Sequence, residues 1–119
     1  MTRIYVFSDK RYPGWLKIGQ TNGRNVMVRI KEQYATVIPY GEMPFKLEYE
    51  TSATKRDNTA ITDHDVHYML SAKGFERGYS EWFKCELRDV KEAIADIKNG
   101  IEPEEYVKRG MENGLFKRI

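Results

Sequence analysis

Two short segments near the start of the chain, Arg3-Ile4-Tyr5-Val6-Phe7 and Trp15-Leu16-Lys17-Ile18-Gly19, decide the fold. Both are rich in the β-branched and aromatic residues that favour strands. The residues between them include Ser8-Asp9 and Pro13-Gly14, which are typical of turns. The pattern predicts a β-hairpin with a loop longer than the commonest types.

The hairpin should have one aliphatic face and one mixed face, because successive side chains along a strand point to opposite sides. Ile4 and Val6 share a face on the first strand, as Leu16 and Ile18 do on the second. The opposite faces carry more polar side chains, among them Tyr5 and Lys17.

The rest of the chain predicts helices interspersed with strands. Apolar side chains at helical spacing and turn residues at the boundaries carry these predictions. We expect helices over residues 26–34 and 58–72, a third through residues 90–97, and a fourth that starts at Pro103. Strands are expected over residues 45–50 and, more weakly, 81–85. This order predicts an α/β arrangement, with helices that cover a small sheet.

The composition indicates one compact domain. The chain has 119 residues, of which 40% are hydrophobic, 13% aromatic and 32% charged. These values argue against a disordered chain, and no apolar run reaches the ~20 residues that cross a bilayer. The single cysteine cannot form an internal disulfide, and the N-terminus does not resemble a signal peptide. We therefore expect a cytoplasmic protein with no membrane partner. The net charge of +2 neither requires nor excludes a nucleic-acid partner.

Several catalytic motifs are missing from the sequence: GxGxxG, the P-loop, CxxC and HExxH. What remains is a set of polar side chains near the ends of the predicted elements: Tyr5, Lys17, Arg29, Asp63, His67 and Glu81. A base, cations and a carboxylate together suit hydrolysis of a phosphodiester with a divalent cation. Each residue taken alone has a structural explanation, such as packing for Tyr5 or a solvated charge for Arg29. Cys85, in an apolar context, is interpreted as a structural thiol.

In this order the residues resemble the GIY-YIG nuclease superfamily, in the branch found in phages and near the N-termini of bacterial restriction-type helicases. The hairpin matches that branch's "YVY … PG-hydrophobic-KIG-polar-T" pattern. Arg29 matches its helical arginine, Val66-His67-Tyr68-Met69-Leu70 its "hydrophobic-H-x-x-L" helix, and Ser80-Glu81-Trp82-Phe83 its "x-E-W/F-F" ending. The resemblance covers residues 4 to 94.

The resemblance implies an α+β fold, with a small three-stranded, largely antiparallel sheet flanked by helices. It also implies a DNA endonuclease that uses one divalent cation, normally Mg²⁺. Tyr5 would contact or deprotonate the attacking water, and Lys17 stands where many members have a second tyrosine. Arg29 would bind the scissile phosphate. Because an ammonium group favours the ionised form of a nearby phenol, Lys17 would lower the pKa of Tyr5 from its usual ~10.

The metal-binding carboxylate has two candidates. Glu81 matches the acidic motif of the branch, whereas Asp63 lies near the place of the helical glutamate that most members use. We favour Glu81 and keep Asp63 as its rival. His67 corresponds to the helical histidine of the branch, and we expect it to contact phosphate or water. Arg3 stands where the first motif has glycine.

The expected organisation is a nuclease domain over residues 1–100 and a helical extension or tail over 101–119. The expected partner is DNA, and a helicase or another domain is expected if the chain is a module of a longer protein. A second hypothesis is a non-catalytic DNA-binding or regulatory module that keeps the fold. A third, prompted by apolar Leu115, Phe116 and Ile119 in the tail, is a protein-interaction domain.

Overall fold

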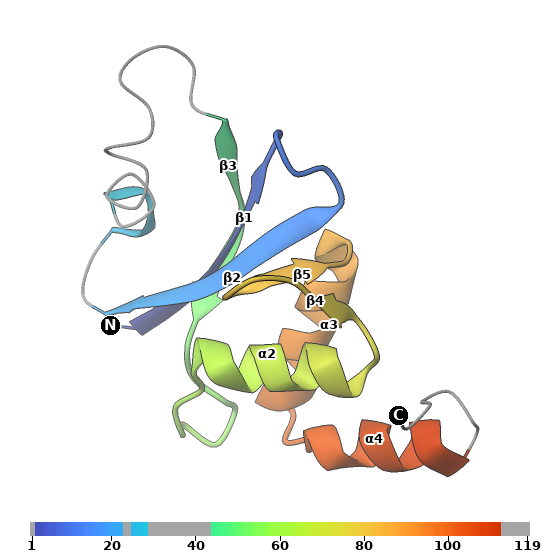
Figure 1. The fold of residues 1–119 in the computed structure, drawn as a ribbon. Helices are drawn as coiled ribbons and strands as arrows, with labels where there is room; N and C mark the ends of the chain where they lie inside the picture. The colour runs from blue at the N-terminus through green and yellow to red at the C-terminus, as the bar shows by residue number, and fades with distance from the viewer. Residues whose placement is uncertain (1, 23–24, 29–43, 113–119) are drawn as a thin grey trace.

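The structure, a computed structural model, describes residues 2–22, 25–28 and 44–112. Its centre is one five-stranded antiparallel sheet with helices packed on it, an α+β fold (Figure 1). The strands, in the spatial order β3-β1-β2-β5-β4, are β1 (Thr2–Asp9), β2 (Trp15–Asn22), β3 (Phe45–Ser52), β4 (Glu76–Arg77) and β5 (Trp82–Lys84). All four neighbouring strand pairs are antiparallel.

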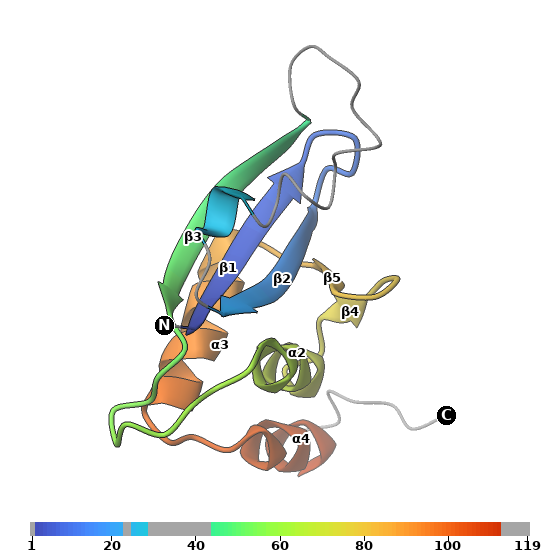
Figure 2. The ribbon, with the colours of Figure 1, turned by 90° about the vertical axis from the view of Figure 1, so that its left-hand side faces the viewer.

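Two helices cover the aliphatic face of the sheet, and a third packs against the first of these two. They are α2 (Asp63–Ala72), α3 (Leu87–Lys98) and α4 (Pro103–Glu112). Side chains of α2 and α3 form one buried core with Ile4, Val6 and Ile18 of the hairpin. On the other face, Tyr5 and Phe7 pack with Val26 from a short helical segment at residues 26–28. Figure 2 shows that segment and α3 on opposite sides of the sheet. The alternation predicted for the hairpin is therefore confirmed.

The prediction of three strands is wrong in number. The three long strands lie side by side as β3-β1-β2, and the short strands β5 and β4 extend the sheet beyond β2. β4 has two residues and β5 has three, below the usual length of about five or six residues. Segments this short cannot show the period-two alternation that identifies strands. They are strands because β5 pairs with β2 and β4 pairs with β5.

The helix predicted from residue 58 begins instead at Asp63. Thr62 caps it: its hydroxyl accepts a hydrogen bond from the Asp65 amide (3.2 Å), and the Asp65 carboxylate accepts one from the Thr62 amide (2.8 Å). This reciprocal pair is a capping box, which satisfies amide donors that the helix leaves open. Upstream, Asn58 has a φ of 69°, which a helix does not allow. Ile61 is buried as predicted, but from the loop.

β3 is the outermost strand on one side of the sheet in the described part of the chain. Charged residues Lys46, Glu48 and Glu50 alternate along it with apolar ones. Two of them contact β1: the Glu50 carboxylate pairs with Arg3 at 3.0 Å, and Glu48 accepts a hydrogen bond from the Ser8 hydroxyl at 3.0 Å.

Some predictions fall on residues outside the description. These are the part of the predicted 26–34 helix beyond residue 28, with Arg29 in it, and the apolar residues of the C-terminal tail. Among the described helices, none combines the length and the apolar character that crossing a membrane would need.

Candidate active site

The Tyr5 side chain occupies a fixed place above β2. Tyr5 pairs with Gly19 across the hairpin, and its side chain is buried. A Cβ atom at position 19 would lie 2.6 Å from both Cζ and the hydroxyl oxygen of Tyr5. Glycine is therefore needed at position 19 because the phenol ring lies directly over it. The Phe7 ring stacks on the Tyr5 ring at 5.9 Å between centroids, which supports the phenol from the side.

Lys17 lies on the same face of the hairpin as Tyr5. It pairs with Phe7 on β1, two pairs along from the Tyr5–Gly19 pair. Its ammonium nitrogen lies 5.6 Å from the centroid of the Phe7 ring, within the range of a cation–π contact. Phe7 thus has Tyr5 on one side and the Lys17 ammonium group on another.

The two rival carboxylates lie together. Glu81 directly precedes β5, and its backbone carbonyl accepts a hydrogen bond from the amide of Ile18 on β2 (3.1 Å). Asp63 is the first residue of α2, and its backbone amide donates to the side-chain oxygen of Gln20 on β2 (2.7 Å). The two carboxyl groups lie close enough for Asp63 to raise the pKa of Glu81, after burial, which is the larger cause. Asp63 and Glu81, which the sequence analysis treats as alternatives, therefore form one carboxyl pair at the edge of β2.

The environment of Glu81 disfavours its negative charge. Burial raises the pKa of the Glu81 carboxyl above its usual value, and the neighbouring carboxyl of Asp63 raises this pKa further. The nearby charges of Lys17 and His64 lower the pKa and oppose this effect only in part. A carboxyl group whose charge is disfavoured by burial and by a neighbouring carboxyl is common in functional sites, because a bound cation can relieve the repulsion.

His67 ties α2 to β2. Its ring is buried, and its Nε2 lies 2.8 Å from the carbonyl oxygen of Ile18. A carbonyl can only accept, so Nε2 carries the proton and donates. Nδ1 is buried and has no hydrogen-bond partner in the described part of the chain, so it is an acceptor that no donor satisfies there. Burial lowers the pKa of His67, which favours the neutral ring.

These contacts converge on three consecutive residues of β2. Tyr5 lies over Gly19, Glu81 and His67 bind the backbone of Ile18, and Asp63 binds Gln20. β5 pairs with β2 only as far as Lys17, so the edge of β2 beyond that residue is left to these groups.

The sequence of the chain matches the model of one protein family. The model of the T5orf172 domain matches residues 2–98, which contain the whole sheet, α2 and α3. The chain belongs to the T5orf172 domain family. This family is generally regarded as related to the GIY-YIG nucleases, and the resemblance is confirmed at that level. Neither a search of curated proteins nor one of solved structures gave a significant match.

In this T5orf172 domain, the described residues contain no cluster of three or more His, Cys, Asp or Glu side chains arranged to hold a metal ion. A carboxyl pair still fits Mg²⁺, because this ion keeps several water ligands and often binds through only one or two carboxylates. Asp63 and Glu81 are the residues that would hold it. A cation there would also offset the mutual repulsion that raises the pKa of Glu81.

The sequence missed two members of this site. Gln20 orients the first turn of α2, and no pattern in the sequence distinguished it from an ordinary strand residue. His64 is the second of these residues. It is exposed, and its Nε2 lies 3.9 Å from an Asp63 carboxylate oxygen. Its position directly after Asp63 was the available signal. Arg29 lies outside the described residues, so its place in the site stays a prediction.

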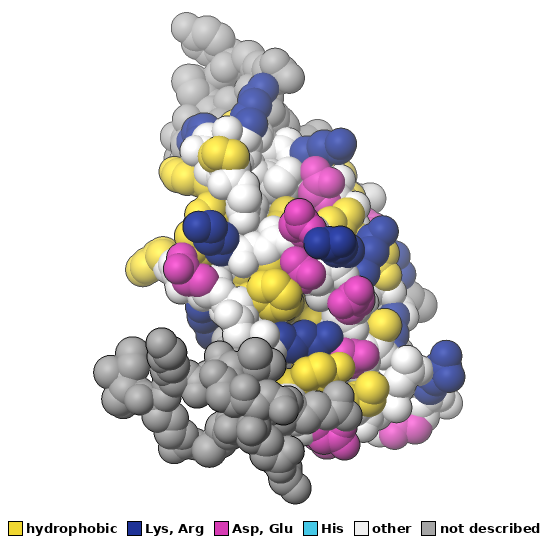
Figure 3. All heavy atoms as spheres, turned by 90° about the vertical axis from the view of Figure 1, so that its right-hand side faces the viewer, with side chains coloured by type: hydrophobic (Ala, Val, Ile, Leu, Met, Phe, Trp, Pro, Cys, Tyr) yellow, Lys and Arg dark blue, Asp and Glu magenta, His cyan; other side chains and the backbone are white. Residues whose placement is uncertain are grey.

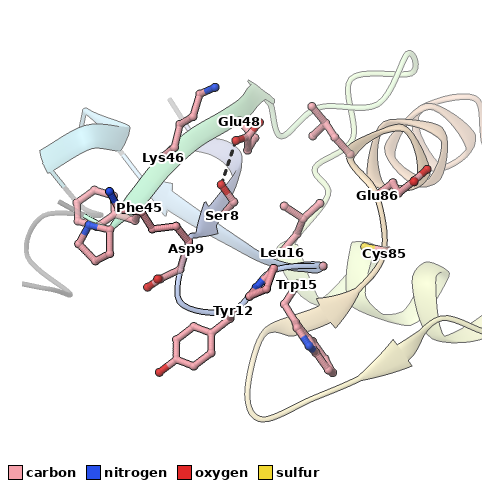
Figure 4. A pocket seen from close by; sticks show the side chains of 15 residues that line it. Ser8, Asp9, Tyr12, Trp15, Leu16, Phe45, Lys46, Glu48, Cys85 and Glu86 are labelled. Atoms are coloured by element: carbon pink, nitrogen blue, oxygen red, sulfur yellow. Dashed lines mark hydrogen bonds between the residues drawn. The ribbon is translucent and has the colours of Figure 1, made fainter. Parts of the chain in front are cut away.

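A separate hollow of about 860 Å³ lies at the far end of the hairpin, and none of the predicted site residues lines it (Figure 4). Its wall includes Cys85. Burial raises the pKa of the Cys85 thiol to about 12, so the thiol stays protonated at neutral pH. A thiol of this kind is a poor nucleophile, as expected for a structural residue.

Proposed function

We propose that this T5orf172 domain is a DNA endonuclease that hydrolyses phosphodiester bonds with one magnesium ion and a tyrosine base. The observation that supports this most is the convergence on β2: a phenol, an ammonium group and a carboxyl pair are placed around residues 17–20 of one strand. Family membership adds the link to known nucleases.

The roles of the residues follow from their chemistry. The Tyr5 oxygen accepts a proton from the water that attacks the phosphorus, while the bond from phosphorus to the leaving oxygen breaks. The Lys17 ammonium group favours the ionised form of the phenol and attracts the phosphate backbone. Arg29 binds the scissile phosphate. His67 holds α2, and with it Asp63, against β2 through its hydrogen bond to Ile18.

Asp63 and Glu81 would hold the magnesium ion. When bound, the ion polarises the scissile phosphate and offsets its developing charge. Binding requires both carboxyls to be ionised, and the raised pKa of Glu81 opposes this in the empty site. Metal affinity should therefore increase with pH until Glu81 is fully deprotonated.

A second candidate function is DNA binding without cleavage, and one observation favours it. The Tyr5 side chain is only 1% exposed, so water reaches the phenol poorly in the described state. A nuclease of this kind would have to admit water to Tyr5 when DNA binds. A module that only binds DNA would keep Tyr5 as a packing residue.

Incubation with supercoiled plasmid, in magnesium or in EDTA, separates the two functions. We expect nicked or linear product only with magnesium. Glu81→Gln and Asp63→Asn keep the side-chain shapes and remove a charge, so each should abolish cleavage while the protein stays folded. Glu92→Gln, on an exposed position of α3, is the matched control and should cleave normally. Plasmid binding without cleavage by the unmodified domain would favour the second function.

A further inference from the structure

A groove with aromatic walls lies between the β1–β2 loop and the β4–β5 turn. It has a volume of about 360 Å³ and is lined by Tyr12, Trp15, Gly78, Tyr79 and Trp82. Four of these five residues are aromatic. Figure 2 shows the β4–β5 turn projecting from the sheet, and Figure 4 shows Tyr12 and Trp15 extending to the same side of the hairpin.

Two of the four aromatic side chains of this groove are open to solvent, and the two tryptophans are half-buried. Tyr79 is 91% exposed and Tyr12 is 52% exposed. Tyr12 also meets Trp82 edge to face, with 5.8 Å between ring centroids. A clustered set of exposed aromatic rings marks an interaction site more often than a stable bare surface.

Gly78 keeps the groove open on the turn side. A Cβ atom there would lie 2.7 Å from Cζ3 of the Trp15 ring, closer than real contacts allow. The Trp15 ring is therefore seated directly against the backbone of the β4–β5 turn. This contact fixes one wall of the groove, so the spacing between its walls is set by the fold.

Lysines alternate with the tryptophans on the same face of the sheet. In the register of β2 and β5, Trp15 faces Lys84 and Lys17 faces Trp82. Residues two apart on a strand share a face, so all four side chains lie on one side. Each tryptophan thus has a lysine directly opposite it and another two residues along its own strand. Figure 3 shows the side of the molecule opposite to that in Figure 2, where basic, acidic and hydrophobic side chains are mixed. Beside the aromatic rings the positive charge comes from Lys17 and Lys84, of which Lys84 also faces Glu76 on β4.

We propose that this groove stacks an unpaired base of a nucleic-acid strand, with Lys17 and Lys84 contacting the flanking phosphates. Aromatic rings stack on any base, and cations beside them attract the backbone, which together bind single strands without reading their sequence. The proposal deepens the proposed nuclease function. It rests on that function for the path of the bound nucleic-acid strand, which runs from the groove toward the candidate active site.

The groove lies beside the candidate active site, across the buried ring of Phe7. The Phe7 ring lies 6.0 Å from that of Trp82 and 5.9 Å from that of Tyr5, so a single ring separates the groove from the proposed base. A strand bound at the groove would therefore place a phosphate close to the scissile position within one or two nucleotides. The substrate class that this arrangement favours is DNA with unpaired or splayed bases next to the cleavage site.

Proline-rich peptides also bind aromatic grooves. The two lysines opposite the tryptophans favour a polyanion over such a peptide. Their positive charges attract phosphate groups, whereas an uncharged proline ring gains nothing from them. The peptide is therefore the competing occupant in the test.

The test uses the fluorescence of the two tryptophans of the chain, both of which line the groove. The full chain in EDTA is titrated with a short oligothymidylate, with an abasic oligomer of equal phosphate number, and with oligoproline. Stacking should quench the emission with oligothymidylate, and the abasic oligomer should bind about 5- to 100-fold more weakly.

Tyr79→Ala should weaken binding of oligothymidylate by a similar factor and leave the abasic oligomer unaffected. Tyr79 is so exposed that its removal should not disturb folding. Tyr68→Ala is the matched control, because Tyr68 is an exposed tyrosine on α2 outside the groove. It should bind like the unmodified chain.

Equal binding of the two oligomers, or a normal affinity in Tyr79→Ala, would overturn the proposal. So would quenching by oligoproline under conditions where oligothymidylate causes none. Because EDTA prevents metal-dependent cleavage, these results do not depend on catalysis. A failure of the nuclease function appears instead in the plasmid assay, where Glu81→Gln and magnesium are the variables.

Discussion

Replacing Gly19 with alanine is the sharpest perturbation that the fold offers. Gly19 is an internal residue of β2 with no requirement for a positive φ, so its backbone accepts an L-residue. By propensity alone, Gly19→Ala should stabilise the strand by roughly 0.5–1 kcal/mol. The Tyr5 ring reverses this expectation, because the new methyl group would lie 2.6 Å from its Cζ and hydroxyl oxygen.

The size of the effect follows from that contact. An ordinary contact begins near 3.4 Å, so the phenol must move by at least about 0.8 Å. Tyr5 is buried and stacked on Phe7, which resists the movement. Overpacking of this kind costs about 1–3 kcal/mol of unfolding free energy. If Tyr5 is the base, a shift approaching 1 Å should also lower the cleavage rate by about 100-fold.

Urea denaturation of a double-mutant cycle tests this explanation. Tyr5→Phe retains Cζ, so Gly19→Ala should cost nearly as much in that background as in the unmodified chain. Tyr5→Leu lacks the distal ring atoms, so there Gly19→Ala should cost little or nothing. An equal cost in the Tyr5→Leu and Tyr5→Phe backgrounds would refute the idea that the ring contact requires glycine at position 19.

Tyr5→Phe should lower the plasmid cleavage rate by about 10²- to 10⁴-fold with little change in the urea midpoint, and a normal rate would exclude Tyr5 as the base. Lys17→Met should move the pH profile of cleavage to higher pH, whereas an unchanged profile would remove Lys17 from the mechanism. Because the folded pKa of Glu81 is raised, its contribution to stability is complete below its unfolded pKa and is lost as the pH rises through the folded pKa. Glu81→Gln should therefore flatten this part of a melting-temperature profile against pH, and an identical decline in the variant would assign it to another group. Thr62→Ala should cost about 0.5–2 kcal/mol in urea denaturation through loss of the α2 cap, and an unchanged midpoint would show that the capping box contributes nothing.

The hairpin could be predicted from the sequence because the signal for it lies in neighbouring residues of the chain. The alternation that separates Ile4 and Val6 from Tyr5 and Phe7 has a period of two over a long enough run to be read, and the structure confirms both faces. The third long strand has the same strict alternation. The prediction that α2 begins at residue 58 is wrong. The sequence signal for its true start is the capping-box spacing of Thr62 and Asp65.

The arrangement of the site could not be predicted because it depends on tertiary pairing. Asp63 and Glu81 are far apart in the sequence, and each reaches the edge of β2 through a different element. Whether they compete for a role or act as a pair depends on where β5 ends against β2. That point is set by a three-residue strand too short to leave a periodic pattern.

In the described part of the chain β3 forms one edge of the sheet, and this has a consequence for how the domain behaves at high concentration. An eight-residue outer strand offers backbone donors and acceptors that could pair with the same strand of another molecule and begin aggregation. Lys46, Glu48 and Glu50 counter this by placing charge along the strand, where close approach of a second copy would bury it. Surface redesign to improve crystallisation should therefore leave these three residues in place and start from exposed side chains of α3.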